Sequence, residues 1–207
     1  MSSSTYFDQV ANQWDDLRAS FFSEAVRDQA VAAAGVEKGK LAADIGAGTG
    51  FITEGLVKLG VRVIAVDESE AMLAELQKKF AGDNSIEVRV GHGDAIPITD
   101  SSVDYVFANM YLHHVENPPQ AIAEMVRILK RDGALVITDL DEHEVEFLRT
   151  EHHDRWLGFR RRDLEKWLQN AGLRQVAVTS TNERCTSTSS HGPATAAIGI
   201  FLASGQK

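Results

Sequence analysis

The stretch Ala43–Thr53, which reads ADIGAGTGFIT, decides the fold that this sequence predicts. The apolar run Leu41–Ile45 leads into three glycines at alternate positions, and a helix-like segment follows them. Glycine lets the backbone turn sharply and approach a ligand closely. A strand, a glycine turn and the start of a helix together form a nucleotide-binding corner. The spacing of the glycines therefore bears on which nucleotide this corner binds.

The glycine spacing departs from the dinucleotide fingerprint G-x-G-x-x-G. Phe51 occupies the position of the third glycine, which comes one residue early at Gly50. Asp44 lies two residues before the first glycine, where its negative charge would repel a pyrophosphate and attract an ammonium or sulfonium group. The pattern favours S-adenosylmethionine over NAD. For so short a motif, a tight glycine turn without a ligand is the alternative.

The composition is that of an ordinary globular protein. The chain has 207 residues, of which 43% are hydrophobic and 25% are charged, which suits one α/β domain with a sizeable core. No apolar run approaches the roughly 20 residues that span a bilayer, and the first residues lack the pattern of a secretory signal. A formal net charge of -9 disfavours a nucleic-acid surface. The single cysteine, Cys185, agrees with a reducing compartment, so we expect a cytoplasmic protein.

Short apolar runs alternate with helical runs after Lys40, which predicts a doubly wound, mostly parallel sheet. The expected strands are Leu41–Ile45, Val61–Val66, Ile86–Val90, Val103–Ala108 and Ala134–Thr138. The expected helices are Phe51–Leu59, Glu70–Phe80 and Pro118–Lys130, with N-caps at Ser69 and Asn117 and C-terminal stops at Gly60 and Gly133.

The two ends of the chain depart from this alternation. An expected helix at Asp163–Ala171 precedes two β runs, Gln175–Thr181 and Thr195–Ala203, with a Ser- and Thr-rich connection at 182–194. Strands joined without a helix are antiparallel, so the sheet should end in an antiparallel pair. Apolar residues at helical spacing over Tyr6–Phe22 predict an amphipathic helix that caps the sheet. We expect one domain, with a helical cap at 1–40 and the core at 41–207.

Four motifs occur in one order along the chain: ADIGAGTG (43–50), VIAVDESEAML (63–73), GHGDAIPI (91–98) and VDYVFANMYLHHV (103–115). Together they resemble the motifs of the class I S-adenosylmethionine-dependent methyltransferases, and among these the small-molecule enzymes of the quinone-biosynthesis type. The resemblance covers nearly the whole chain. It implies a Rossmann-like sheet of seven strands in the order 3-2-1-4-5-7-6. It also implies S-adenosyl-L-methionine as cofactor and S-adenosyl-L-homocysteine as product, with methyl transfer to a small molecule.

By the same resemblance, the cofactor-binding residues follow the carboxyl ends of the strands. They are Asp44, Gly46, Ala47, Gly48, Gly50, Asp67, Glu68, Met72, Asp94, Ala95 and Asn109. Asp44, the glycines and Asn109 would contact the methionine part. Asp67 would accept from both ribose hydroxyls, and Asp94 from the adenine amine, beside the N–H of Ala95. A capping role for Asp67, a turn role for Asp94 and a core position for Met72 are the structural alternatives.

Methyl transfer needs little chemical activation by the protein, because the methyl group of a sulfonium is already activated towards attack. Holding donor and acceptor in line is then the main catalytic effect, and a general base is needed only if the acceptor must lose a proton. His114 and His143 are the candidate bases, with hydrogen-bonded histidines near the surface as the alternative. Tyr111, Trp156 and Phe159 favour an apolar or aromatic acceptor. The full set of residues expected around the acceptor is Tyr111, His113, His114, Asp139, Asp141, His143, Trp156 and Phe159.

Several points stay open at this stage. No metal is expected, because no histidines are paired at i, i+4 and no cysteines cluster. The N-terminal helix either packs on the sheet or forms a lid over the cofactor. A non-catalytic S-adenosylmethionine-binding protein and, less favoured, an NAD-dependent oxidoreductase are the alternative functions. The sequence indicates neither the methylated atom of the acceptor (carbon, oxygen or nitrogen) nor the oligomeric state.

Overall fold

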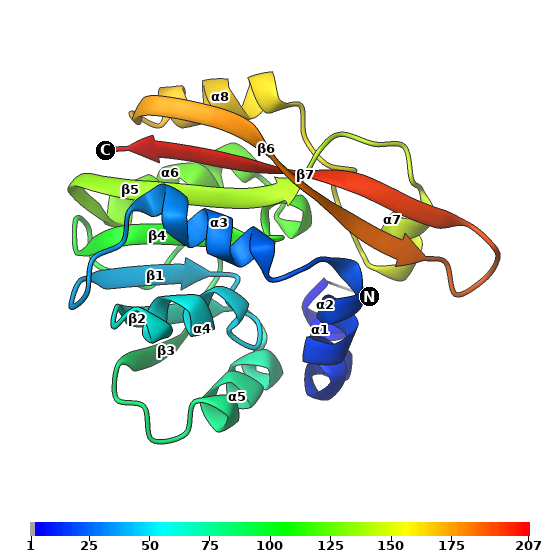
Figure 1. Cartoon of the computed structure of the whole chain (residues 1–207), viewed down its shortest axis with the longest axis horizontal. Helices are drawn as coiled ribbons and strands as arrows, with labels where there is room; N and C mark the ends of the chain where they lie inside the picture. The colour runs from blue at the N-terminus through cyan, green and yellow to red at the C-terminus, as the bar shows by residue number, and fades with distance from the viewer. Residues whose placement is uncertain (1–2) are drawn as a thin grey trace.

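Seven strands form one sheet in the order β3-β2-β1-β4-β5-β7-β6 (Figure 1). The structure is a computed structural model that describes the backbone of residues 3–207 and the side chains of residues 6–207. The strands are β1 (Leu41–Ile45), β2 (Arg62–Asp67), β3 (Ile86–Val90), β4 (Val103–Asn109), β5 (Leu129–Leu140), β6 (Arg174–Thr188) and β7 (Thr195–Gln206). β1 to β5 are parallel, and β7 is antiparallel to both β5 and β6. The predicted strand order and antiparallel pair are confirmed.

Helices cover both faces of the sheet, because the central strands are apolar on both sides. In β2, Val63 belongs to one buried cluster and Ile64 to the other. One face carries α3 (Ala25–Ala34), α4 (Phe51–Lys58) and α5 (Glu70–Lys79), and the other carries α6 (Pro118–Ile128) and α8 (Arg161–Asn170). Within residues 3–207, no helix combines the length and the hydropathy needed to cross a membrane.

The helix starts follow the predicted capping chemistry. The Ser69 hydroxyl oxygen accepts from the N–H of Met72 at 3.1 Å, and the Asn117 side chain accepts from the N–H of Gln120 at 3.3 Å. Such caps satisfy backbone donors that have no partner within the helix. The caps therefore fix where α5 and α6 begin, at the edge of the sheet where β2 and β4 end.

The N-terminal segment is broken where the sequence predicted one helix over Tyr6–Phe22. It forms α1 (Ser3–Val10), a 3-10 turn η1 (Ala11–Gln13) and α2 (Trp14–Phe21). The break brings the ring of Trp14 against that of Phe7, with centroids 5.2 Å apart. α1 and α2 lie beyond the carboxyl ends of β1 and β4 (Figure 1). α3, which the sequence did not predict, packs on the face of the sheet instead.

Two expectations near the C-terminal half were wrong. The helix expected to Lys130 ends at Ile128, and Gly133 lies inside β5 instead of stopping the helix. A Cβ at Gly133 would lie 2.8 Å from the carbonyl oxygen of Asp104, so the close approach of β4 explains a glycine within a strand. β6 runs to Thr188 through much of the expected 182–194 connection, with a bulge between Ser180 and Arg184.

The long β6–β7 hairpin extends past the other strands and, with the short helix α7 (Phe147–Glu151), reaches the same edge as α1 and α2 (Figure 1). The sequence predicted neither α7 nor this extension. Thr186 Oγ1 donates to the carbonyl oxygen of Ser20 at 3.1 Å, which ties the hairpin to α2. The carboxyl edge of the sheet is therefore enclosed by three segments that lie far apart in the sequence.

Candidate active site

The loop between β1 and α4 folds over the end of β2. Gly46, Gly48 and Gly50 have φ values of 69°, 53° and 89°, a region that strains residues with a side chain. The N–H of Gly46 donates to the carbonyl oxygen of Val66 at 2.8 Å, and the N–H of Gly48 donates to Oδ2 of Asp67 at 2.8 Å. The alternate glycines therefore let the loop wrap around the end of the neighbouring strand.

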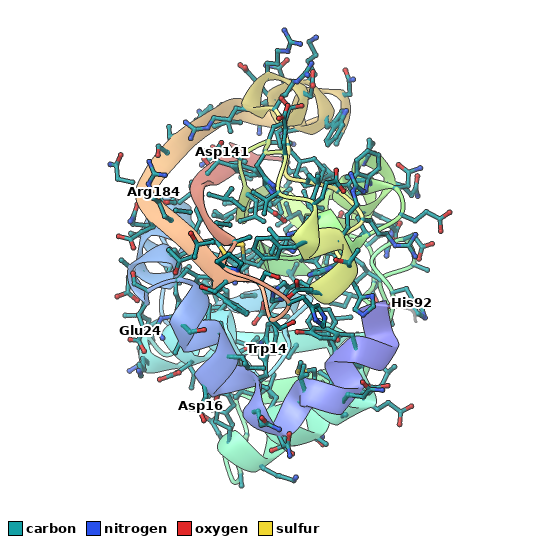
Figure 2. The ribbon with its side chains drawn as sticks, turned by 90° about the vertical axis from the view of Figure 1, so that its right-hand side faces the viewer. Trp14, Asp16, Glu24, His92, Asp141 and Arg184 are labelled. Atoms are coloured by element: carbon teal, nitrogen blue, oxygen red, sulfur yellow. The ribbon has the colours of Figure 1, made fainter. Side chains whose placement is uncertain are left out.

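A cavity, here called the glycine-loop cavity, lies between this loop and the N-terminal helices. Seven of the predicted cofactor residues line it: Gly46, Ala47, Gly48, Asp67, Glu68, Met72 and Asn109. Its other walls come from Phe7, Trp14, Arg18, Phe22, Thr49, Phe51, Met110, Tyr111 and His114. Figure 2 views the edge of the molecule that α1 and α2 cover, with Trp14 towards the middle and His92 near the periphery.

The N-terminal helices are attached directly to the loops that carry the predicted cofactor residues. Ser69 Oγ donates to Asp8 at 2.6 Å, and Thr49 Oγ1 donates to Asp15 at 2.6 Å. Lys79 adds an ion pair to Asp15 at 3.1 Å. α1 and α2 therefore form one wall of the cavity and cover it from the solvent side.

Four predicted cofactor residues lie outside the lining of this cavity. Asp44 is buried, and its Oδ2 accepts from the N–H and the hydroxyl of Thr53 at 3.0 and 2.7 Å. Gly50 begins α4. Asp94 lines an adjoining cleft, and the N–H of Ala95, expected to face the adenine, donates to the carbonyl oxygen of His92 at 3.1 Å.

Tyr111 separates the glycine-loop cavity from the cleft at Asp94. Its ring lies against Gly46 and its hydroxyl against Gly93, so that a Cβ on either glycine would collide with it. Burial and the nearby carboxylates of Asp67 and Glu68 raise the pKa of its hydroxyl. The sequence placed Tyr111 at the acceptor, whereas the structure places it between the two parts of the predicted cofactor site.

Two carboxyl groups lie next to the glycine loop, the buried Asp44 and the half-buried Asp67. Asp67 accepts from the N–H of Ser69 at 2.9 Å in addition to that of Gly48. Burial raises the pKa of Asp67 to about 6, although these hydrogen bonds oppose the shift. Burial also raises the pKa of Asp44 to about 6, with a further contribution from the charge of Asp67 and opposition from Thr53. With pKa values of about 6, both groups are mainly ionised at pH 7, and each carboxylate keeps further acceptor capacity.

Arg18 of α2 supplies a guanidinium group to the glycine-loop cavity. The group lies over the Phe51 ring, 4.3 Å from its centroid. Its buried Nε has no hydrogen-bond partner within residues 6–207. A guanidinium with a free N–H matches the geometry of a carboxylate, such as that of the methionine part. Arg18 was not among the predicted site residues, since a single arginine on an amphipathic helix carries no motif.

A second cavity, here called the aromatic cavity, shares a wall with the first. The shared residues are Phe7, Trp14, Phe22, Met110 and His114. The remaining lining residues are Tyr6, Phe21, His113, Leu140, Leu148, His152, Asp154, Cys185 and Ser187. They come from α1, α2, the loop after β4, the end of β5, α7 and the loop after it, and β6. The sequence predicted a partly aromatic acceptor cavity closed by the loops after the fourth and fifth strands and the N-terminal helix. A partly aromatic cavity lies there, and segments after β4 and β5 line it together with α1 and α2.

A buried histidine between two carboxylates lies at one end of the aromatic cavity. Nδ1 of His113 lies 2.7 Å from Oδ1 of Asp139, and Nε2 lies 3.8 Å from Oδ1 of Asp154. Burial opposes the imidazolium form, but the two carboxylates outweigh burial and raise the pKa of His113 to about 9. The sequence singled out His113 and Asp139 but missed Asp154, which comes from the loop after α7.

His114 is the one predicted base that reaches the cavities. It lines both of them, and its ring packs edge-to-face on Phe7 with centroids 5.0 Å apart. Burial and the charge of His113 lower the pKa of His114, which keeps it neutral at pH 7. His143 lines neither cavity, and its Nδ1 accepts from the N–H of Val145 at 3.2 Å.

Three other residues expected around the acceptor have structural partners elsewhere. Asp141 forms a two-pronged ion pair with Arg161, with both N···O distances at 2.7 Å. Phe159 is buried in the apolar cluster under α8. Trp156 is 41% exposed and donates from Nε1 to the carbonyl oxygen of Val115. None of the three lines the aromatic cavity.

Comparison with known proteins agrees with this geometry. The family described as a methyltransferase domain matches residues 43–137. The demethylmenaquinone methyltransferase of Thermobifida fusca (strain YX) is 35% identical over 176 residues, which cover 83% of this chain and 69% of that protein. This chain belongs to the class I S-adenosylmethionine-dependent methyltransferases. The methyltransferase therefore uses S-adenosylmethionine as its cofactor. The alternative function, an NAD-dependent oxidoreductase, is excluded.

One further sequence relative and one solved structure are similar to this methyltransferase. It is 34% identical over 108 residues to the malonyl-(acyl-carrier protein) O-methyltransferase of Methylococcus capsulatus, covering 51% of this chain and 39% of that protein. A solved S-adenosylmethionine-dependent methyltransferase from Aquifex aeolicus superposes with a TM-score of 0.70 at 21% identity, covering 96% of this chain and 97% of that one. The structural match concerns the fold. The acceptors named for the relatives differ, so relatedness leaves the acceptor of this methyltransferase open.

Proposed function

We propose that this methyltransferase transfers a methyl group from S-adenosylmethionine to a small, largely apolar aromatic acceptor held in the aromatic cavity. The observation that carries the proposal is the wall of Phe7, Met110 and His114, which the aromatic cavity shares with the glycine-loop cavity. A methyl donor in the glycine-loop cavity and an acceptor in the aromatic cavity would come closest to each other beside these residues.

Each part of the cofactor has a matching group in the glycine-loop cavity and the cleft beside it. Arg18 would hold the carboxylate of the methionine part, and the buried Asp44 would favour its ammonium group through the glycine loop. Asp67 would accept from the ribose hydroxyls. Asp94 would accept from the adenine amine, once the Tyr111 ring moves from between Gly46 and Gly93. The glycines leave the room that this close approach needs.

Positioning is the main catalytic contribution of the protein. The cofactor supplies a methyl group on a sulfonium, which the acceptor displaces while the electron pair of the broken bond stays on sulfur. Phe7, Trp14 and the hairpin exclude water from the meeting point, and in-line orientation contributes up to about 7–11 kcal/mol in favourable cases. His114, neutral and directed at both cavities, is the residue proposed to contact the polar atom of the acceptor.

The lining of the aromatic cavity favours a quinol-like acceptor over an anionic one. Aromatic rings of Tyr6, Phe7, Trp14 and Phe21 contribute to it, and no lysine or arginine does so among residues 6–207. One relative is named a demethylmenaquinone methyltransferase, and we propose a reduced naphthoquinone as the first acceptor to test. A cytoplasmic location and the absence of a nucleic-acid partner are part of the same proposal, on the acidic composition and single cysteine of the chain.

Transfer of labelled methyl groups tests the proposed acceptor. The full chain is incubated with S-adenosylmethionine labelled on the methyl group and with a reduced short-chain demethylmenaquinone, a malonyl thioester or no acceptor. We expect label in the quinol only. Trp14→Ala should lower kcat/KM for the quinol at least tenfold, while Trp156→Ala, on an exposed tryptophan, leaves it unchanged. Label in the malonyl thioester alone, or equal effects of the two variants, would overturn the proposed acceptor site.

A further inference from the structure

Two histidines and an aspartate meet at the end of the aromatic cavity. The atoms of His113, His114 and Asp154 that can bind a metal ion all lie within 4.8 Å of one another. We propose that these three side chains bind one divalent transition-metal ion, of the Zn²⁺ class, where the aromatic cavity meets the glycine-loop cavity. No sequence motif predicts such a site, because the two histidines are adjacent and the aspartate lies on a different loop.

The ring of His113 is held in the orientation of a metal ligand. Its Nδ1 lies 2.7 Å from Asp139, which leaves Nε2 directed at Asp154. Histidines that bind metals usually donate their other ring N–H to a carboxylate in this way. Ligands about 2.0–2.2 Å from a tetrahedral ion lie about 3.4 Å apart. The 3.8 Å between Nε2 and Asp154 Oδ1 is therefore within a small side-chain movement of a metal-bound arrangement.

His114 supplies an independent observation. Its buried Nδ1 has no hydrogen-bond partner within residues 6–207. A buried polar atom without a partner costs about 1–3 kcal/mol. A metal ion at Nδ1 would satisfy that lone pair.

The ligand types of the cluster also suit a divalent transition-metal ion. Asp154 and the supporting Asp139 are carboxyl groups in almost complete burial. Imidazole and carboxylate ligands favour zinc and its neighbours in the first transition row over magnesium and calcium.

Three protein ligands leave a fourth position of a tetrahedral ion open, as in catalytic zinc sites. Here the open position would face the aromatic cavity, which His113, His114 and Asp154 all line. An oxygen of the acceptor could bind there and be held beside the shared wall. This role for the ion rests on the proposed function, whereas binding of the ion itself does not.

Metal titration of the full chain tests the site directly. Protein freed of metal with a chelator is titrated with Zn²⁺ by calorimetry and with Co²⁺ by visible absorption. We expect one equivalent of each, and Co²⁺ bands typical of four-coordination. Asp154→Asn and His113→Ala should weaken binding at least tenfold, and the positioning variant Asp139→Asn by about 10–100-fold. His143→Ala, which changes a histidine outside the cluster, should bind as the parent does.

Binding that is absent, or equally strong in all of these variants, would overturn the site and leave His113 as an imidazolium between two carboxylates. Because a variant can fail to fold, X-ray absorption of the unmodified protein loaded with Zn²⁺ provides a second measurement. Two imidazole ligands and one carboxylate are expected, and a shell of water oxygens alone would contradict the proposal. Titration of the same samples with S-adenosylhomocysteine keeps the two proposals apart, since the cofactor can bind where the metal fails.

Discussion

The carboxylate of Asp67 accepts a hydrogen bond from the N–H of Gly48 at 2.8 Å. This contact joins the end of β2 to the glycine loop after β1, so that one half-buried acid both shapes the loop and lines the cavity beside it. Asp67, which would bind the ribose, therefore also fixes the glycine loop, which would bind the methionine part. Substitutions at either residue should change cofactor binding, and their effects can be separated with fragments of the cofactor.

Asp67→Asn should weaken binding of S-adenosylhomocysteine and of 5′-methylthioadenosine alike, because both carry the ribose. A charge-assisted hydrogen bond is worth about 1.5–3 kcal/mol, which corresponds to about 10–100-fold in Kd. Calorimetry measures both affinities, and Asp83→Asn, at an exposed turn, is the control. A collapse of the melting temperature with unchanged affinity in the folded fraction would show that Asp67 is only a structural residue.

Arg18→Gln should weaken binding of S-adenosylhomocysteine about tenfold or more and leave 5′-methylthioadenosine nearly unaffected. The second ligand lacks the amino-acid carboxylate that the guanidinium would pair with. The same calorimetric titrations give both values. Equal losses for the two ligands would place Arg18 elsewhere than at the carboxylate.

The affinity for S-adenosylhomocysteine should fall as the pH falls through about 6. Asp67 and Asp44 have pKa values raised to about 6, and only the ionised carboxylates accept hydrogen bonds from the ribose or attract the ammonium group. If one of these groups must be ionised, affinity at pH 5 should be about tenfold lower than at pH 7.5. In Asp67→Asn this dependence should become shallower, and an unchanged pH profile in that variant would contradict the role of Asp67.

Ionisation of Asp67 and Asp44 should favour cofactor binding but lower the stability of the free protein. Because their pKa values are higher in the folded chain than in the unfolded chain, the folded state binds more protons between about pH 4 and 6. Their contribution to the free energy of unfolding therefore falls as the pH rises through that window. Comparing urea unfolding of the parent and Asp67→Asn at pH 5 and 7.5 measures it, and Asp67→Asn should gain relative stability at the higher pH.

Gly46→Ala should destabilise the protein more than Gly39→Ala. Both glycines have left-handed φ values, 69° and 83°, but a Cβ meets the Tyr111 ring at Gly46 and nothing within 4 Å at Gly39. The shared backbone strain is about 1–2 kcal/mol, and the collision adds about 1–3 kcal/mol. Chemical unfolding measures the difference. Equal losses in the two variants would mean that the Tyr111 ring does not occupy the loop.

Asp15→Ala should loosen the N-terminal helices, whereas Asp16→Ala should not. Asp15 accepts from Thr49 and pairs with Lys79, while its exposed neighbour Asp16 lies towards the periphery of the edge in Figure 2. Limited proteolysis should cleave α1 or α2 faster in Asp15→Ala, and S-adenosylhomocysteine should slow the cleavage. Identical cleavage rates in the two variants would show that the Asp15 contact does not hold α1 and α2 in place.

The sheet could be predicted from the sequence because buried parallel strands are continuous apolar runs, and the strands from Leu41 to Ala108 were placed within one residue at each end. The Ser- and Thr-rich continuation of β6 could not, since its alternation is interrupted by a bulge. Asp67 was singled out because it ends a strand. Arg18 and Asp154 were missed because each acts through a contact between segments far apart in the chain, which leaves no local spacing to recognise.

A crystal structure with S-adenosylhomocysteine would test the central claim most directly. We expect its ribose on Asp67, its carboxylate on Arg18 and the Tyr111 ring displaced from Gly93. We expect its sulfur at the wall of Phe7, Met110 and His114, facing the aromatic cavity. A sulfur directed away from that wall, with the aromatic cavity closed off from the cofactor, would contradict the assignment of the two cavities to donor and acceptor.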